Sequence, residues 1–182
     1  MGSRKTTTWN GETLPDYLRD GLDVVFVGLN PGLYSAQVGH YFAYKHNRFW
    51  EALSQSGLVP EPVGPEDDSR LLGWGIGLTD IVKRPTSGIH EVSQREFRLG
   101  AKTLQEKIVR YQPLVVCFVG LTGYRICCGD KPKLGEKANH FGGSPVFVIP
   151  STSPRNANYS LPQIVTAMQD LRAYLRSVKG EV

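Results

Sequence analysis

The sequence predicts a single α/β domain with three layers, α/β/α, and a mostly parallel central sheet. Its 182 residues, of which 40% are hydrophobic, are enough to bury one full core. Apolar runs alternate along the chain with stretches of helical spacing, as in parallel α/β proteins. Residues 24–27 are consecutive apolar β-formers, which is typical of a strand covered on both faces.

Four apolar runs are the predicted strands. Three of them are rich in Val, Phe and Ile, and the second is a short stretch that begins at Gly77. The four strands are expected over residues 23–29, 77–80, 114–120 and 145–150.

Three helices are predicted from an N-cap residue followed by apolar residues at helical spacing. The first runs to residue 56 and stops at Gly57, and the second ends near residue 111. The third carries Pro162 in its first turn, where proline is tolerated. The N-caps are Asn47, Ser93 and Ser160, and Ser93 also begins a capping box.

The segments outside these elements are interpreted as a tail and loops. Residues 1–20 are expected to form a flexible tail, so that the folded domain covers residues 21–182. Residues 60–68 are rich in Pro and acidic residues and are expected to form a surface loop. Residues 129–144 are expected to form a second loop.

Composition limits the classes of function. A net charge of +4 permits a nucleic-acid partner, although an ordinary mildly basic protein fits it equally well. The three cysteines, Cys117, Cys127 and Cys128, have no metal-ligand spacing, so we expect no metal site and no cofactor. No apolar run reaches the length of a membrane span, so no membrane partner is expected.

The most informative segment follows the first predicted strand and reads Gly28-Leu29-Asn30-Pro31-Gly32. It places the Asn30 amide at the carboxyl end of a strand, where open α/β sheets bind their ligands. Three interpretations stay open from the residues alone. The segment is a plain turn, a phosphate loop that lacks the usual glycine pattern, or the position of a catalytic amide that orients a water molecule.

Three further segments carry candidate side chains. Phe42 precedes a helix and can stack on a flat ring, whereas Phe49 and Trp50 are expected in the core. Lys83 and Arg84 follow a strand and are a weak signal for phosphate contacts. The loop over residues 150–158 carries hydroxyl side chains and one arginine, which suit DNA contacts, although capping serines at a helix entry explain it as simply.

Together these segments resemble the mismatch-specific uracil/thymine DNA glycosylase family, which contains the bacterial mismatch uracil glycosylases and the eukaryotic thymine-DNA glycosylases. The family's G-I-N-P-G-L motif corresponds to residues 28–33. Its continuation corresponds to residues 35–50, its middle signature to 75–86 and its last motif to 150–155. The order and spacing match from about residue 22 to about residue 178.

The resemblance implies a uracil-DNA glycosylase-like fold and a monofunctional enzyme. Such an enzyme flips a damaged pyrimidine out of double-stranded DNA, hydrolyses its N-glycosidic bond and leaves an abasic site that starts base excision repair. It implies no cofactor, no metal and no membrane, and we expect a monomer. By the same resemblance, Asn30 positions the water, Leu29, Ser35 and Phe42 bind the base, and the DNA-contacting wedge loop contains Ser151, Ser153, Pro154 and Arg155.

The chain departs from the bacterial pattern at three places. Ser151-Thr152-Ser153 replaces Asn-Pro-Ser and is closer to the eukaryotic form, Pro154 begins the wedge, and Asp80 replaces a common lysine. The final loop and the basic tail favour a nuclear location, with bacterial cytoplasm as the alternative. Ser35 matches the bacterial serine, and its hydroxymethyl group would crowd a 5-methyl group. We therefore expect a preference for uracil, especially opposite guanine, over thymine.

Two alternatives stay open. Another branch of uracil glycosylases would use an aspartate beside Gly28 or an iron–sulfur cluster with four cysteines, and this chain has neither. A non-catalytic Rossmann-like module that binds nucleotides or nucleic acid through the Gly28 turn is the second alternative.

Overall fold

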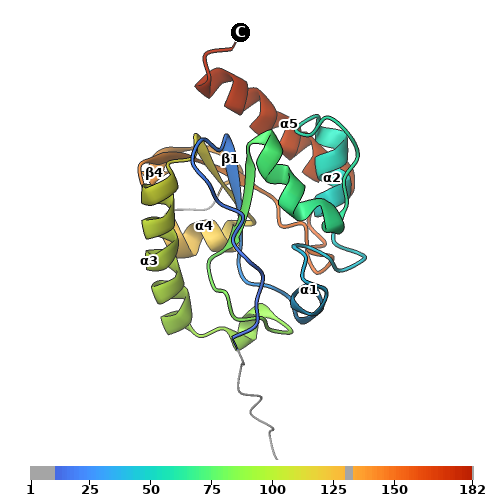
Figure 1. The fold of residues 1–182 in the computed structure, drawn as a ribbon, viewed down its shortest axis with the longest axis vertical. Helices are drawn as coiled ribbons and strands as arrows, with labels where there is room; N and C mark the ends of the chain where they lie inside the picture. The colour runs from blue at the N-terminus through green and yellow to red at the C-terminus, as the bar shows by residue number, and fades with distance from the viewer. Residues whose placement is uncertain (1–10, 130–132, 182) are drawn as a thin grey trace, which may run out of the picture.

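The computed structural model describes residues 11–129 and 133–181. Its centre is a five-stranded sheet in the order β2-β1-β3-β5-β4, in which only β4 is antiparallel to its neighbour (Figure 1). This confirms the predicted fold class, a single α/β domain with a mostly parallel sheet. The strands are β1 (Val24–Gly28), β2 (Ile76–Asp80), β3 (Val115–Val119), β4 (Gly135–Phe141) and β5 (Ser144–Ile149).

Helices cover both faces of the sheet (Figure 1). One core contains side chains of α2 and α5 against Val24 and Phe26, and the other contains side chains of α3 and α4 against Val25 and Val27. Alternate residues of β1 therefore enter opposite cores, as the pleat of a strand requires. The helices are α1 (Leu33–Val38), α2 (Phe49–Ser56), α3 (Gln94–Tyr111), α4 (Leu121–Cys128) and α5 (Leu161–Val178), with 3₁₀ helices η1 (Pro65–Trp74) and η2 (Ile89–Glu91).

The predicted caps of the two long helices are confirmed. The hydroxyl of Ser93 accepts the N–H of Glu96, and the Glu96 carboxylate accepts the N–H of Ser93, so the capping box is complete. Ser160 caps α5 in the same way. The side chain of Asn47 does bind the N–H of Phe49 at 3.0 Å, but the N-cap position itself is taken by Arg48.

Two expected loops contain regular structure, so those predictions are wrong. Residues 135–141 form β4, an edge strand with polar side chains on both faces, so a search for apolar runs misses it. In the expected loop at 60–68, residues 65–68 form the start of η1, where Asp68 is buried at 1% exposure. The short helices α1 and α4 are not predicted either, because their N-caps are Gly32 and Gly120, which have no side chain to cap a helix.

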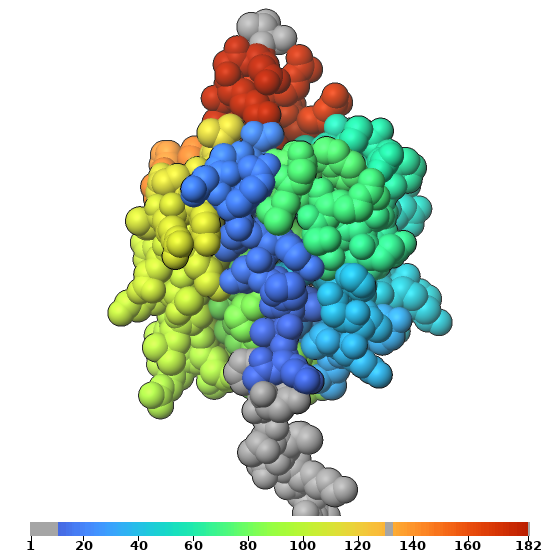
Figure 2. Space-filling view, viewed as in Figure 1, coloured from blue at the N-terminus to red at the C-terminus, as the bar shows by residue number. Residues whose placement is uncertain are grey.

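The folded domain begins before residue 21, where the sequence analysis placed its start. Leu14 is buried in the core, and Tyr17 pairs with Leu78 through two backbone hydrogen bonds of 2.9 and 3.1 Å. This segment covers the outer edge of β2, and Figure 2 shows it in blue along one face of the molecule. Residues 1–10 of the expected tail and residue 182 lie outside the described residues.

Within the described residues, no helix is long and apolar enough to cross a membrane.

The strand order determines where a ligand can lie. From β1 the chain crosses to β2 on one side of the sheet, and β3 lies on the other side of β1. The loops that leave β1 and β3 therefore diverge, which is the arrangement that produces a ligand crevice at the carboxyl ends of such strands. Asn30 lies two residues beyond the end of β1.

Candidate active site

The loops at the carboxyl edge of the sheet are bonded to one another. The N–H groups of Ile81 and Val82 donate to the carbonyls of Gly28 and Leu29, both at 2.9 Å. The N–H of Thr86 donates to the carbonyl of Pro31 at 3.1 Å. The loop after β2 therefore continues the pairing of β1 and β2 past the strands and fixes the turn that carries Asn30.

The amide of Asn30 has a defined orientation. Its Nδ2 donates to Thr86 Oγ1 at 2.8 Å, to the carbonyl of Arg84 at 3.0 Å and to the carbonyl of Pro31 at 3.3 Å. Among the described residues, no donor contacts its Oδ1. Since all the donor capacity of the amide is used inside the protein, the oxygen is the group that Asn30 offers to a ligand or a water molecule.

Thr86 is a site residue to which sequence reasoning gave no role. Its side chain is 3% exposed, and its hydroxyl donates to the carbonyl of Gly88 at 3.0 Å. The hydroxyl proton is therefore committed to Gly88, which leaves a lone pair of Oγ1 for the Asn30 amide. Thr86 is the last residue of the segment 75–86, which matches the middle signature of the family. Only the fold shows that its side chain contacts Asn30.

Phe42 is held in an unusual backbone conformation. Its φ is 50°, in the left-handed region that bulky residues rarely adopt. The preceding residue is fixed by two bonds, from the Tyr41 N–H to Asp68 (3.1 Å) and from the Trp50 indole to the Tyr41 carbonyl (2.8 Å). The strain is thus maintained by the surrounding structure.

The ring of Phe42 lies at the carboxyl end of β1. One face stacks on Phe49 with centroids 4.2 Å apart and an interplanar angle of 24°. Phe49 and Trp50 are buried, as predicted, whereas Phe42 is half-buried. Its Cε1 lies within 4 Å of the position that a Cβ on Gly28 would occupy, so this ring is next to the turn that carries Asn30.

Ser35 and Leu29 border the same place in different ways. Ser35 is buried on α1, and its Oγ accepts the N–H of Ala43 at 3.0 Å, immediately after Phe42. The side chain of Leu29 packs against the α3 and α4 core, away from Phe42. Leu29 therefore contributes its backbone to the site, and Ser35 holds the segment that positions Phe42.

A buried carboxyl lies beside the turn. Asp80, paired with Gly28 in the sheet, is 4% exposed, and its Oδ1 would be 2.5 Å from a Cβ at Gly28. Only glycine therefore fits at residue 28. Burial raises the pKa of Asp80 to about 7, although Lys83, whose Nζ lies 3.9 Å from Oδ2, lowers it in part. Oδ2 has no hydrogen-bond partner among the described residues.

Lys83 and Arg84 do not form a free basic pair for phosphates. The Lys83 Nζ donates to Asp16 at 2.8 Å and to the Tyr41 hydroxyl at 3.0 Å. The guanidinium of Arg84 binds the Glu96 carboxylate at 2.6 and 3.1 Å. Both cations are thus neutralised inside the fold, and the interpretation as phosphate ligands is not supported.

Arg48 organises the predicted wedge loop, and sequence reasoning gave it no role of its own. Its backbone N–H donates to the carbonyl of Thr152 at 3.1 Å. Its guanidinium donates to carbonyls along the loop, namely those of Ser153 (2.7 Å), Asn156 (3.0 Å), Thr152 (3.4 Å) and Tyr159. One planar cation thus fixes the loop path from β5 towards α5.

The tip of the wedge loop faces solvent. Pro154 and Arg155 are exposed, and Arg155 Nη2 donates to the carbonyl of Ser87 at 3.0 Å. The hydroxyls of Ser151 and Ser153 accept N–H groups of Ser153 and Arg155, both at 3.3 Å. Both serines therefore bond within the loop and neither caps a helix, since the N-cap of α5 is Ser160, so the interpretation as capping serines is not supported. The tip of the loop lies against the segment that contains Thr86.

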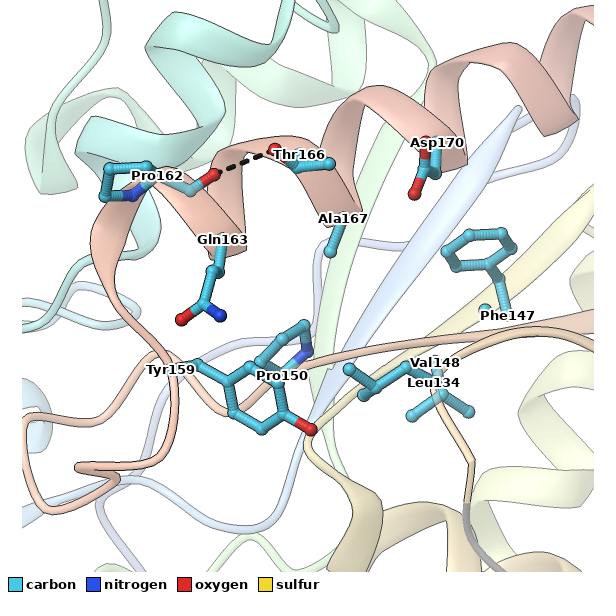
Figure 3. Close-up of a pocket in the computed structure, with 11 residues that line it drawn as sticks. Leu134, Phe147, Val148, Pro150, Tyr159, Pro162, Gln163, Thr166, Ala167 and Asp170 are labelled. Carbon is cyan, nitrogen blue, oxygen red and sulfur yellow. Dashed lines mark hydrogen bonds between the residues drawn. The ribbon is translucent and has the colours of Figure 1, made fainter.

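A cavity of about 330 Å³ lies on the other side of the wedge loop, between α5 and the β4–β5 pair (Figure 3). None of the predicted site residues lines it. The polar side chains that line it are Tyr159, Gln163, Thr166 and Asp170. Of these, the Gln163 amide oxygen accepts the N–H of Ser160, and the Thr166 hydroxyl donates to the carbonyl of Pro162. We place the site at the Asn30 turn, because the oriented amide of Asn30 lies at the carboxyl end of β1, where open α/β sheets bind their ligands.

The sequence pattern of the uracil DNA glycosylase superfamily matches residues 15–175. The chain belongs to the uracil DNA glycosylase superfamily. The fold is also similar to the solution NMR structure of a protein from Methanosarcina acetivorans described as a candidate uracil DNA glycosylase. That likeness has a TM-score of 0.61 at 20% identity and covers 92% of this chain and 98% of the other.

Membership of the superfamily is consistent with a DNA-binding site at the Asn30 turn. Enzymes of the uracil DNA glycosylase superfamily act on DNA, and the carboxyl edge of the sheet contains an oriented amide, a stacked aromatic ring and an exposed loop tip. Among the described residues, no group of His, Cys, Asp or Glu side chains could hold a metal ion.

Proposed function

We propose that this protein is a monofunctional DNA glycosylase that removes uracil, preferentially opposite guanine, and thymine only weakly. It hydrolyses the N-glycosidic bond and leaves an abasic site, which initiates base excision repair. The observation that carries the proposal is the Asn30 amide, whose nitrogen is fully bonded while its oxygen is left for a water molecule. One flipped base occupies one site, so a monomer is sufficient.

The role of Asn30 follows from its chemistry. An amide is too weak a base to remove a proton from water, but a fixed oxygen can hold the water in line with the sugar carbon. The bond to the base must then break largely by itself, through an oxocarbenium-like state. Uracil is a better leaving group than a normal base, so a mild activator restricts cleavage to bases that can depart as anions.

Phe42 supplies the surface for the base. One face of its ring is covered by Phe49, so a flipped pyrimidine would stack on the other. The backbone N–H of Phe42 has no acceptor among the described residues and can donate to an oxygen of the departing anion. The Pro154–Arg155 tip would enter the space that the flipped nucleotide leaves in the helix.

The test is cleavage of a duplex with a single G·U pair, read by alkaline strand scission under single-turnover conditions. We expect cleavage by the native protein and a loss of about 10²–10⁴-fold in rate for Asn30→Ala, with unchanged affinity for a duplex that contains an uncleavable uridine analogue. A protein that binds the duplex without cutting it would instead be the non-catalytic module.

Ser35 is proposed to set the preference for uracil over thymine. Ser35→Ala should raise the G·T rate relative to the G·U rate, because the space for a 5-methyl group increases. Alanine also removes the bond to Ala43, so the ratio of the two rates is the quantity to compare. Ser35→Thr keeps the hydroxyl and adds a methyl group, so it should lower the ratio of the G·T rate to the G·U rate. Equal native rates on G·U and G·T would disprove the preference.

A further inference from the structure

An exposed cluster of aromatic and apolar side chains lies next to the Asn30 turn. Tyr34 and Tyr44 are 50% and 47% exposed, and Leu33 and Val38 of α1 are exposed beside them. With His46 we call these residues the aromatic patch. Exposed apolar groups that lie together in this way mark interaction sites.

The rings of the patch are arranged edge to face. Tyr34 and Tyr44 have centroids 6.4 Å apart at an angle of 79°, and Tyr44 and His46 have centroids 5.5 Å apart at 71°. In an edge-to-face pair the edge of one ring meets one face of the other, and the exposure of Tyr34 and Tyr44 shows that about half of each side chain stays open to solvent. Such faces are what a planar ligand needs for stacking.

The patch belongs to the same structural unit as the site. Helix α1 begins three residues after Asn30, and the Ser35–Ala43 hydrogen bond joins it to the stretch that contains Phe42 and Tyr44. Figure 1 shows α1 at the end of the molecule opposite the C-terminus, and Figure 2 shows this part of the chain, in light blue, at the lower right of the surface.

The charge around the patch selects its partner. In the sequence, no acidic residue occurs between Asp23 and Glu51, and Lys45 is exposed between Tyr44 and His46. The carboxylate that reaches this segment, Asp68, is 1% exposed and lies 3.3 Å from His40, so it is not presented at the surface. Aromatic faces next to a cation are the combination that binds unpaired nucleotides by stacking and phosphate contact. A protein partner would not require this one-sided charge.

We propose that the aromatic patch is a stacking platform for an unpaired nucleobase of the DNA strand that enters the site. The inference rests on the proposed function and adds to it a contact with a base that flanks the flipped nucleotide. Bases in an intact helix are stacked on their neighbours, so the platform is used only where a flanking base is free.

The experiment measures binding of an oligothymidine single strand by fluorescence anisotropy, which does not depend on cleavage. We expect the Tyr34→Ala, Tyr44→Ala double variant to bind about tenfold more weakly than the native protein, since one stacked base is worth about 1–3 kcal/mol. The Tyr34→Phe, Tyr44→Phe double variant keeps the rings and should bind as the native protein does. Leu99→Ala, an equally exposed apolar residue on α3, is the control.

Three outcomes would overturn the platform. They are native protein that does not bind oligothymidine, an alanine double variant with native affinity, and a phenylalanine variant as weak as the alanine one. A change of oligomeric state in sedimentation without a change in DNA affinity would also overturn it, and would assign the patch to a second copy of the chain. Failure of the native protein to cleave uracil in any DNA would remove the proposed function, while the binding comparison would still decide on the platform.

Discussion

At the scale of single residues, the orientation of the Asn30 amide depends on Thr86, a residue that is buried behind it. Thr86 Oγ1 accepts a hydrogen bond from the Asn30 amide and donates its own hydrogen bond to the carbonyl of Gly88. The pair decides which end of the amide faces the site. An Asn that could rotate would present its nitrogen to water for part of the time, and a donor cannot hold the lone pair of water in the attacking direction.

Thr86→Val is therefore expected to lower the single-turnover rate about two- to tenfold, the usual range for one hydrogen bond. Its shape is nearly that of threonine, so the affinity for a duplex with an uncleavable uridine should not change. Thr86→Ser restores the hydroxyl and should restore the rate. If the valine and serine variants cleave equally fast, the hydroxyl does not orient Asn30.

A second prediction at this scale concerns the buried carboxyl of Asp80 and the dependence of stability on pH. The unfolded chain loses the Asp80 proton near pH 4, whereas the folded protein keeps it until about pH 7, because burial disfavours the carboxylate. The folded state thus binds more protons between these values. Burial of Asp80 therefore does not lower the free energy of unfolding below pH 4, where the carboxyl is protonated in both states. As the pH rises from 4 to about 7, the free energy of unfolding falls.

Asp80→Asn removes that titration. Urea unfolding should show the variant gaining stability relative to the native protein from pH 5 to pH 8, by more than about 1 kcal/mol, because one pKa unit corresponds to about 1.4 kcal/mol. Asp20→Asn, at an exposed position, is the control. A difference between the Asp80 variant and native protein that stays constant with pH would contradict the buried acid.

At the scale of elements, the wedge loop depends on Arg48, which belongs to the start of α2. Because four nitrogen atoms of Arg48 donate five hydrogen bonds to carbonyls of the loop and of Tyr159, the loop is structured without regular secondary structure of its own. The loop after β5 is thereby joined to the start of α2, so the position of the loop tip is fixed relative to Phe42.

Arg48→Ala should lower the free energy of unfolding by about 2 kcal/mol, since hydrogen bonds from a charged donor are among the stronger ones. It should also weaken duplex binding, because the wedge tip loses its fixed position. Arg48→Lys should behave like the alanine variant, as an ammonium cannot reach several carbonyls in one plane. Arg98→Ala on the surface of α3 should leave both quantities unchanged.

At the scale of the whole molecule, the segment before β1 closes one edge of the sheet. Asp16 receives hydrogen bonds from Lys83, Lys107 and Thr79, and these contacts lower its pKa although burial raises it. Leu14 and Tyr17 add apolar packing and backbone pairing to β2. The loop after β2, which orients Asn30, is thus supported from its outer side.

Leu14→Ala is expected to destabilise the protein by about 2–4 kcal/mol, the range for a large-to-small change in a core. Leu99→Ala makes the same change at 57% exposure and should cost far less. Urea unfolding of the two variants and the native protein is the measurement. Equal stability of the two variants would mean that the segment before β1 is not part of the core.

The sequence by itself determined the strands that are apolar on both faces, the capped helices and the turn with Asn30. Each of these features depends on residues that are close together in the sequence. They are a run of β-formers, a Ser followed three residues later by Glu, and a Pro-Gly pair after a strand. The order of the motifs also pointed to the superfamily to which the chain belongs.

Only the tertiary structure decided the edge strand β4, the packing of the segment before β1, and the partners of the site. Thr86 meets Asn30 across 56 residues, Arg48 meets the wedge loop across more than 100, and Lys83 is neutralised by Asp16 across 67. Hydrogen-bond partners so far apart leave no local pattern. Which polar groups are satisfied, and which oxygen is left for a ligand, depends on burial and distance in the folded chain.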